Sequence, residues 1–457
     1  MNRYFGLLFA AAPLALVLLP SLISQSRASH GRDRTLFPNP SGASLTVTDS
    51  GDDIDRSNPF FQIMGTNGRS CDTCHQQGEG WTISPDGIKK RFDRSQGTDP
   101  LFRTVDGSNS PLADVSTLKA RRRAYTMLLT KGLIRVGLPL PATAEFELIK
   151  TDDPYNFASA QELSLFRRPL PTTNLPFITA TMWDGREANL QNQANDATRG
   201  HAQADKDLTT LQRQQIVDFE SDLSTAQAAD EDAGTLTAFG AKGGPEALSN
   251  QLFYVGINDL LGDSHTGAPF NNVAMSLYGA WENGGTARND GDREQKEARR
   301  AVSRGEALFN TKPIAITGVA GVNDNPAFGT PAVVNGTCTT CHDTPNIGNH
   351  SVKLALNIGL TDASRRTPDM PLYTLRNKTT GAIVKTTDPG LSLISGRWVD
   401  VGKFKGPILR GLAARAPYFH NGAAEDIPAV LDFYQERFGV SFTRREKSDL
   451  VAFLKTL

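Results

Sequence analysis

The four cysteines of this 457-residue chain form two copies of one short pattern, and that pattern constrains the fold more than any other feature. Each copy has two cysteines separated by two residues and followed at once by a histidine: Cys71-Asp72-Thr73-Cys74-His75 and Cys338-Thr339-Thr340-Cys341-His342. Cys-x-x-Cys-His is the attachment pattern of c-type haem, in which the two thiols bind the macrocycle and the histidine ligates the iron. We therefore expect two covalently bound haem c groups.

Two other arrangements use paired cysteines. One is a zinc site assembled from both pairs, and the other is a pair of short disulfide loops. Neither needs a histidine after each pair, and the βαβ context of redox Cys-x-x-Cys pairs is not found around Cys71 or Cys338. Haem attachment is therefore the favoured interpretation.

The N-terminus has the layout of a secretory signal. A positive start at Arg3 precedes an uncharged apolar run over residues 5–20, and small residues follow at Ser26-Arg27-Ala28. We expect residues 1–28 to be removed near Ala28 and the mature protein to be periplasmic, without stable membrane association. An uncleaved anchor is the alternative, although Pro13 and Pro20 interrupt the run.

Net charge and local sequence patterns limit the possible folds and functions. Lys and Arg total 48 against 49 Asp and Glu, so the basic surface of a nucleic-acid-binding protein is missing. Helical patterns over residues 208–223 and 297–309, and a terminal helix capped at Thr443, favour a mainly α fold. The Gly- and Asn-rich stretch 279–292 is the best linker. We predict two cytochrome c-like haem domains with long loop insertions, over residues 45–290 and 291–457, divided near Asp290.

Two further blocks give the chain a family resemblance. Trp183-Asp184-Gly185-Arg186 lies between the haem motifs, and Arg415-Ala416-Pro417-Tyr418-Phe419-His420-Asn421-Gly422 follows the second. In this order, the blocks resemble the bacterial dihaem cytochrome c peroxidase and MauG superfamily. The resemblance implies that His75 is the proximal ligand of a catalytic haem and His342 that of an electron-transfer haem. It also implies that Trp183 relays electrons between them.

The family also places a second axial ligand fourteen residues after the histidine of the later block, which here is Tyr434. The peroxidase branch has methionine at this position and the MauG branch has tyrosine, so the resemblance is closer to the MauG-like branch. A phenolate oxygen stabilises oxidised iron, so a low potential is expected for this haem. Without the family, Phe433 and Tyr434 are better explained as core aromatic residues of a helix.

The distal side of the first haem departs from the peroxidase pattern. Where the family supplies a displaceable histidine, this chain has Arg91, and no histidine occurs between His75 and His201. Gln203 occupies the position of the family's distal glutamate and cannot exchange a proton at neutral pH. His201 titrates in the right range. We therefore predict His201 as the acid-base residue and Gln203 as its hydrogen-bonding neighbour. A surface histidine on a loop is the alternative for His201.

Three functions are compatible with these residues. The first is reduction of hydrogen peroxide with electrons from a small periplasmic cytochrome c or cupredoxin. The second is MauG-like oxidation of an organic or protein substrate, and the third is electron carriage without a substrate. Members of the family commonly bind a calcium ion between the domains through backbone carbonyls and an Asn side chain. In this chain, Arg415 and Pro417 occupy the carbonyl positions, and Asn174 is the nearest candidate for the side chain.

Overall fold

The computed structural model describes residues 34–285 and 293–457. The predicted signal peptide and the predicted domain boundary at Asp290 lie outside these residues. Of the predicted linker, the described part begins with a short 3-10 helix, Gly279–Trp281, whose Trp281 is completely buried. Within residues 34–285 and 293–457, no helix combines the length and apolar character needed to cross a membrane.

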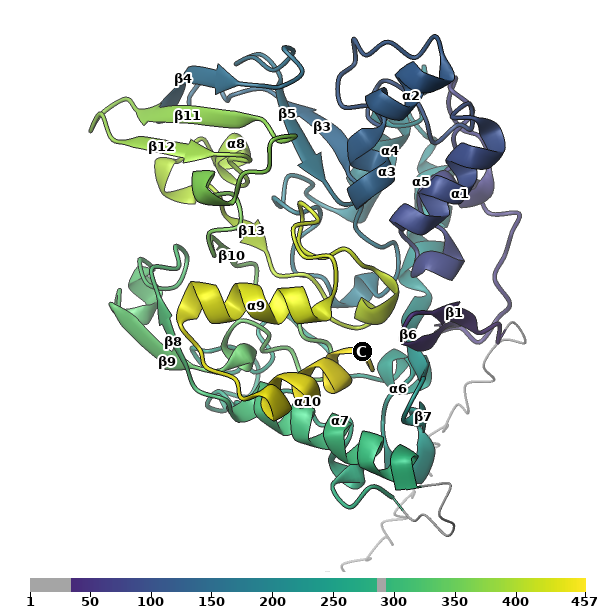
Figure 1. The fold of residues 1–457 in the computed structure, drawn as a ribbon, viewed down its shortest axis with the longest axis vertical. Coiled ribbons are helices and arrows are strands. Elements are labelled where there is room, and N and C mark those ends of the chain that lie inside the picture. Colours follow the sequence, from purple (N-terminus) through teal and green to yellow (C-terminus); the bar gives the residue numbers. More distant parts are fainter. Residues whose placement is uncertain (1–33, 286–292) are drawn as a thin grey trace, which may run out of the picture.

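Helices α1 to α5 lie together in Figure 1, and their buried residues form the two clusters that Cys71 and Cys74 pack against, whereas α6 lies beside β6 (Leu223–Asp230). α1 begins with Pro85 after the cap Ser84, whose hydroxyl accepts the Gly87 N–H, and it buries Ile88 and Phe92. α5 confirms the helix expected over 208–223. The helices are α1 (Pro85–Ser95), α2 (Leu118–Ala124), α3 (Thr126–Lys131), α4 (Leu190–Gly200), α5 (Thr210–Ser221) and α6 (Pro245–Ser249).

The second half is built on α7 (Arg293–Thr311), α8 (Ser392–Ser395), α9 (Ile427–Phe438) and α10 (Arg444–Leu454). The predicted capping box at Thr443 is confirmed, since its hydroxyl accepts the Glu446 N–H and the Glu446 carboxylate accepts the Thr443 N–H. α7 and α10 pack closely at Gly305, where a Cβ would lie only 2.0 Å from the Asp449 carbonyl oxygen. Only glycine permits this approach.

The prediction of a mainly α fold is wrong. The chain is 31% helical and 17% strand, with several sheets. All described pairings between strands are antiparallel, and the sheets are β1-β2-β6-β7, β12-β11-β4, β3-β5, β8-β9 and β10-β13. The strands are β1 (Phe37–Asn39), β2 (Gly42–Thr48), β3 (Ile134–Leu138), β4 (Phe146–Asp152), β5 (Leu163–Arg167), β6 (Leu223–Asp230), β7 (Gly234–Thr235), β8 (Ile314–Thr317), β9 (Val333–Gly336), β10 (Ala355–Leu356), β11 (Leu372–Asn377), β12 (Ile383–Thr386) and β13 (Phe404–Lys405).

The physical reason lies in how the strands are buried and paired. β2 and β6 bury consecutive residues, so neither shows the apolar and polar alternation of a half-exposed strand. Their pairing places Leu45 opposite Ala226, and no pattern within either segment predicts this contact. β4 and β11 also pair, so residues on both sides of the predicted boundary share one sheet (Figure 1).

Candidate haem sites

The two cysteine motifs adopt the same local structure. Each forms one turn of 3-10 helix closed by a capping box, Ser70 with Thr73 in the first and Thr337 with Thr340 in the second. The histidine N–H donates to the carbonyl of the first cysteine at 3.1 Å in both motifs, from His75 to Cys71 and from His342 to Cys338. The internal repeat seen in the sequence is therefore also a repeat in backbone geometry.

Both histidine rings are held by a backbone carbonyl six residues further along the chain. His75 Nδ1 donates to the Trp81 oxygen at 3.0 Å, and His342 Nδ1 donates to the Gly348 oxygen at 2.5 Å. This bond places the proton on Nδ1 and leaves Nε2 free to ligate a metal. Burial lowers the pKa of His75 to about 4, so its ring is neutral at physiological pH, as ligation requires.

The cysteines do not support the two alternatives. All four are free thiols, which excludes disulfide loops. Among the described residues, the two pairs do not converge into one group that could hold a metal ion. Burial raises the pKa of both Cys338 and Cys341 to about 12, so these thiols are neutral groups in an apolar wall.

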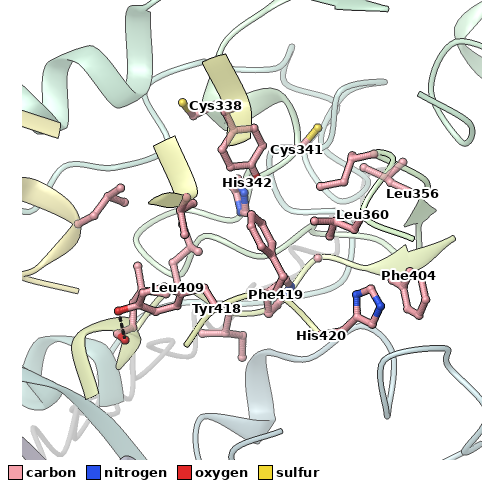
Figure 2. Close-up of a pocket in the computed structure, with 18 of the residues that line it drawn as sticks. Cys338, Cys341, His342, Leu356, Leu360, Phe404, Leu409, Tyr418, Phe419 and His420 are labelled. Atoms are coloured by element: carbon pink, nitrogen blue, oxygen red, sulfur yellow. Dashed lines mark hydrogen bonds between the residues drawn. The ribbon is translucent and has the colours of Figure 1, made fainter. Parts of the chain in front are cut away.

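The second motif opens into a cavity of about 240 Å³ with mostly apolar walls. Figure 2 shows Cys338, Cys341 and His342 on one side of it, with Leu409 and Phe419 among the residues that surround the histidine. Two thiols and an imidazole at the wall of an apolar cavity fit a flat, covalently anchored haem.

Tyr434, on α9, lines the same cavity. Its hydroxyl makes no hydrogen bond to any residue in the described part of the chain, and burial raises its pKa well above the ordinary value. The phenol oxygen therefore has no protein partner among the described residues, and it belongs to a cavity that His342 also lines. This is the environment that the predicted second axial ligand requires.

The first motif lies between two hydrophobic clusters. Cys71 packs against the cluster that contains Phe60 and Trp81, and Cys74 packs against the cluster that contains Phe92. The second motif is similar, because Cys338 contacts two clusters of buried residues. The surroundings of the first motif thus also fit an apolar macrocycle.

A charged network adjoins the first motif. His201 Nδ1 lies 2.6 Å from Asp106 Oδ2, and the Nη1 atom of Arg69 lies 2.7 and 2.8 Å from the two Asp106 oxygens. The side chains of Arg69 and Asp106 are 3% and 6% exposed, whereas that of His201 is 37% exposed. Burial alone would raise the pKa of Asp106, but Arg69 and the hydrogen bond from His201 hold it below its usual range. Asp106 is therefore an anion that fixes the His201 ring.

Gln203 contacts the loop before the first motif, and Arg91 contacts the motif itself. Gln203 is exposed, with a left-handed backbone (φ 55°), and its side-chain oxygen lies 3.4 Å from Asn67 Nδ2. Asn67 connects it with His201, because the same Nδ2 also donates to the His201 carbonyl at 2.8 Å. Arg91 pairs with Asp99 and donates to the Thr73 carbonyl at 2.5 Å, so it braces the motif backbone.

Trp183 lies at the edge of the second cavity. Its Nε1 donates to the Arg168 carbonyl at 2.8 Å, and its ring centroid is 6.1 Å from that of His420. His420 stacks on Phe404 with 3.9 Å between ring centroids, as Figure 2 shows. Burial lowers the pKa of His420 to about 4, so it is a neutral aromatic ring in this cluster.

The segment 168–172 connects Trp183 with the first motif. Trp81, whose carbonyl accepts from His75, also accepts from the Thr172 N–H at 3.1 Å. The next residue, Thr82, donates its hydroxyl to the Pro169 carbonyl at 2.8 Å. Hydrogen bonds therefore run from the His75 ring to the segment that holds the Trp183 ring.

Sequence reasoning missed Arg69, Asp106 and Glu220. Arg69 lies in the loop before the first motif. No sequence pattern near Asp106 indicates that it contacts Arg69 and His201, which are 37 and 95 residues away. Glu220 is buried near Cys71, and burial raises its pKa to about 8. The suggested calcium side chain, Asn174, bonds the Thr225 backbone at 2.8 Å through both its amide nitrogen and its oxygen.

The residues around each motif suit a c-type haem, and comparisons with known proteins identify relatives of the chain. No family model matches the chain. It is 29% identical over 148 residues to the cytochrome c peroxidase IdrP1 of Pseudomonas sp. strain SCT, covering 28% of this chain and 38% of that protein. It is 32% identical over 135 residues to IdrP2 of Denitromonas iodatirespirans, covering 27% and 36%.

A third curated relative is the methylamine utilization protein MauG of Methylorubrum extorquens, 43% identical over 65 residues, which are 12% of this chain and 18% of MauG. A solved MauG-like protein associated with microbial copper homeostasis overlaps 88% of this chain and 86% of its own, with 16% identity and a TM-score of 0.38. The curated homologues of this chain are thus cytochrome c peroxidases and MauG, which confirms the resemblance. The chain spans less than two fifths of the length of each of these curated relatives.

Proposed function

We propose that this chain is an exported dihaem c oxidoreductase that reduces hydrogen peroxide at its first haem site with electrons delivered through the second. The observation that carries the proposal is the network of His201, Asp106 and Arg69 beside the first motif. The names of the curated relatives support the same reaction class.

The chain offers a complete set of residues to hold two haems. Bound haem supplies redox-active iron at each site. The first site is formed by Cys71, Cys74 and His75. The second would be formed by Cys338, Cys341 and His342, and Tyr434 would offer its phenol oxygen to the same haem.

His201 serves as the acid-base residue of the first site. Peroxide cleavage needs a group that takes a proton from one oxygen and returns it to the other. The bond from His201 Nδ1 to Asp106 leaves Nε2 to exchange that proton, and the partial exposure of the ring allows protons to be replaced from water. Arg69 keeps Asp106 ionised, so the ring stays oriented. Gln203 is exposed, and it influences His201 through the Asn67 side chain.

Electrons come from a small periplasmic cytochrome c or cupredoxin and pass between the sites by way of Trp183. The support is the chain of hydrogen bonds from His75 through Trp81 and the segment 168–172 to the Trp183 indole. A rigid, packed route of this kind favours transfer because nothing has to move when the charge passes.

Replacing His201 by alanine tests the proposal. The rate of peroxide reduction in stopped-flow mixing should fall by about 10² or more, the usual contribution of an acid-base group. The matched control is His265→Ala, which removes an exposed histidine from the 250–275 loop. A rate for His201→Ala equal to that of the control would reject the proposed role.

Tyr434 favours a second function, oxidation of an organic or protein substrate by a MauG-like reaction. Its buried phenol replaces the methionine of the peroxidase branch. The two functions differ in one experiment, in which the oxidised protein is mixed with peroxide and then supplied with reduced cytochrome c. Rapid reaction with peroxide without turnover of the cytochrome would favour the oxidase, and sustained turnover would favour the peroxidase.

A further inference from the structure

Three buried side chains of types that bind metals meet beside the second motif, and one of them, His350, also lines the cavity described above. Asp259, Asp343 and His350 each offer one ligand atom, and these atoms all lie within 4.8 Å of one another. The closest measured pair is His350 Nδ1 and Asp343 Oδ2, at 3.4 Å. The three residues are 6%, 0% and 2% exposed, so water hardly reaches them.

Three polar atoms of this cluster lack hydrogen-bond partners among the described residues. Asp259 Oδ2 and both ring nitrogens of His350 make no hydrogen bond within the described residues. Among the same residues, no lysine or arginine forms an ion pair with either carboxylate. A buried unpaired polar atom costs about 1–3 kcal/mol, and a buried charge without a counter-charge costs more. The cluster therefore has unsatisfied polar atoms on Asp259 and His350, and a bound cation would satisfy both.

The cluster is also held in place by the rest of the loop. Asp343 Oδ1 accepts the Ser351 N–H at 2.6 Å, and Asp259 Oδ1 accepts the Leu261 N–H at 2.9 Å. Asn258 Nδ2 donates to the Asp343 carbonyl at 3.0 Å. Asp343 Oδ2 accepts the Ser351 hydroxyl at 3.0 Å and keeps a further lone pair, whereas Asp259 Oδ2 has no partner among the described residues. Both carboxylates are therefore held in place, and each still has an oxygen that can take a ligand.

We propose that Asp259, Asp343 and His350 bind one divalent transition-metal ion, such as Zn²⁺, separate from the haem iron. Two carboxylate oxygens would balance the charge of a dication. The imidazole nitrogen selects against Ca²⁺ and Mg²⁺, which take oxygen ligands, and favours zinc and its neighbours.

The position of the ion gives it a structural role at the second haem site. Asp259 belongs to the 250–275 loop, whereas Asp343 follows the axial residue His342 directly. His350 closes the same short loop that contains Gly348, the acceptor of the His342 ring. The ion therefore ties the 250–275 loop to the loop that orients His342.

Zinc binding to the purified haem-loaded protein tests the site. After removal of loosely bound metal with a chelator, one Zn²⁺ per chain should bind, measured by elemental analysis and by titration calorimetry with Zn²⁺ alone. Asp259→Asn and His350→Gln should each weaken the binding by at least about tenfold, which is about 1.4 kcal/mol. The matched control is His265→Ala, which removes an exposed histidine of the same loop and should leave the binding unchanged.

Two outcomes would overturn the site. One is the absence of a tight Zn²⁺ equivalent in the wild-type protein. The other is unchanged binding in both variants while the haem absorption spectrum shows that they are folded. If His350 instead bonds a haem propionate, His350→Gln shifts the haem potential, no Zn²⁺ binds, and the proposal fails. Peroxide turnover is not used as a readout, so this test is independent of the proposed enzyme activity.

Discussion

Replacing Asp106 by asparagine should destabilise the protein far more than an ordinary surface change. Arg69 is almost completely buried, and Asp106 is the only carboxylate paired with it among the described residues. The guanidinium keeps backbone acceptors at Pro100 and Leu101, both at 2.8 Å, but its charge is left without a counter-charge. Removing one partner of a buried pair costs about 3–5 kcal/mol.

The matched control is Asp99→Asn, which removes the carboxylate of a partly exposed pair with Arg91 near the same motif. Such a pair contributes about 1 kcal/mol or less. We would compare the free energies of unfolding of the haem-loaded variants at pH 7 by urea denaturation followed by circular dichroism. A cost for Asp106→Asn within 1 kcal/mol of the control would refute the reasoning.

The effect also has a defined dependence on pH. The pKa of Asp106 is lower in the folded protein than its ordinary value of 3.8, so the folded state binds fewer protons there than the unfolded state. The stabilisation by Asp106 is therefore fully present above that value and is lost as the pH falls through the lower, folded pKa. The difference between wild type and Asp106→Asn should be constant from pH 5 to 8 and shrink below pH 3.8.

Three further changes give definite expectations. Tyr434→Phe removes the phenol oxygen and should raise the reduction potential of the second haem in a spectroelectrochemical titration, and an unchanged potential would contradict ligation. Trp183→Phe keeps an aromatic ring but removes the N–H held by Arg168, and it should slow transfer between the haems roughly tenfold in stopped-flow measurements, about 1.4 kcal/mol of barrier. Glu220→Gln removes a carboxyl whose pKa burial raises from 4.5 to about 8, so wild-type stability falls as the pH rises between these values. The free energy of unfolding of the variant minus that of wild type should therefore rise by up to about 5 kcal/mol between pH 4 and pH 8, measured by thermal melts. A difference that stays the same across this pH range would count against the prediction.

Local patterns predicted the local structure well. The residues that attach haem, the helix over Thr210–Ser221 and the capping box at Thr443 follow from neighbours a few positions apart, and the structure contains each of these elements. The axial roles of His75 and His342 are supported by their ring hydrogen bonds, but those bonds depend on carbonyls that no motif identifies.

What the sequence could not give was contact between distant segments. The strands β2 and β6 are recognised only once they pair, because both bury consecutive residues. Asp106 has the same difficulty, since its partners lie 37 and 95 residues away and its own surroundings have no distinctive pattern. A residue whose role depends on hydrogen bonds and ion pairs with distant residues cannot be recognised from the sequence next to it.

The difference between the two haem sites arises from such distant residues. The motifs share one backbone geometry, so the motifs themselves cannot make one site reactive and the other an electron store. At the first motif, residues from elsewhere bring an ionised carboxylate and a partly exposed histidine, which are the groups that proton transfer needs. At the second, they bring apolar walls and the Tyr434 phenol, which exclude water and offer an oxygen ligand. The proposed division of labour therefore depends on Asp106, His201 and Tyr434 more than on the cysteines, and exchanging these surroundings should exchange the roles of the two sites.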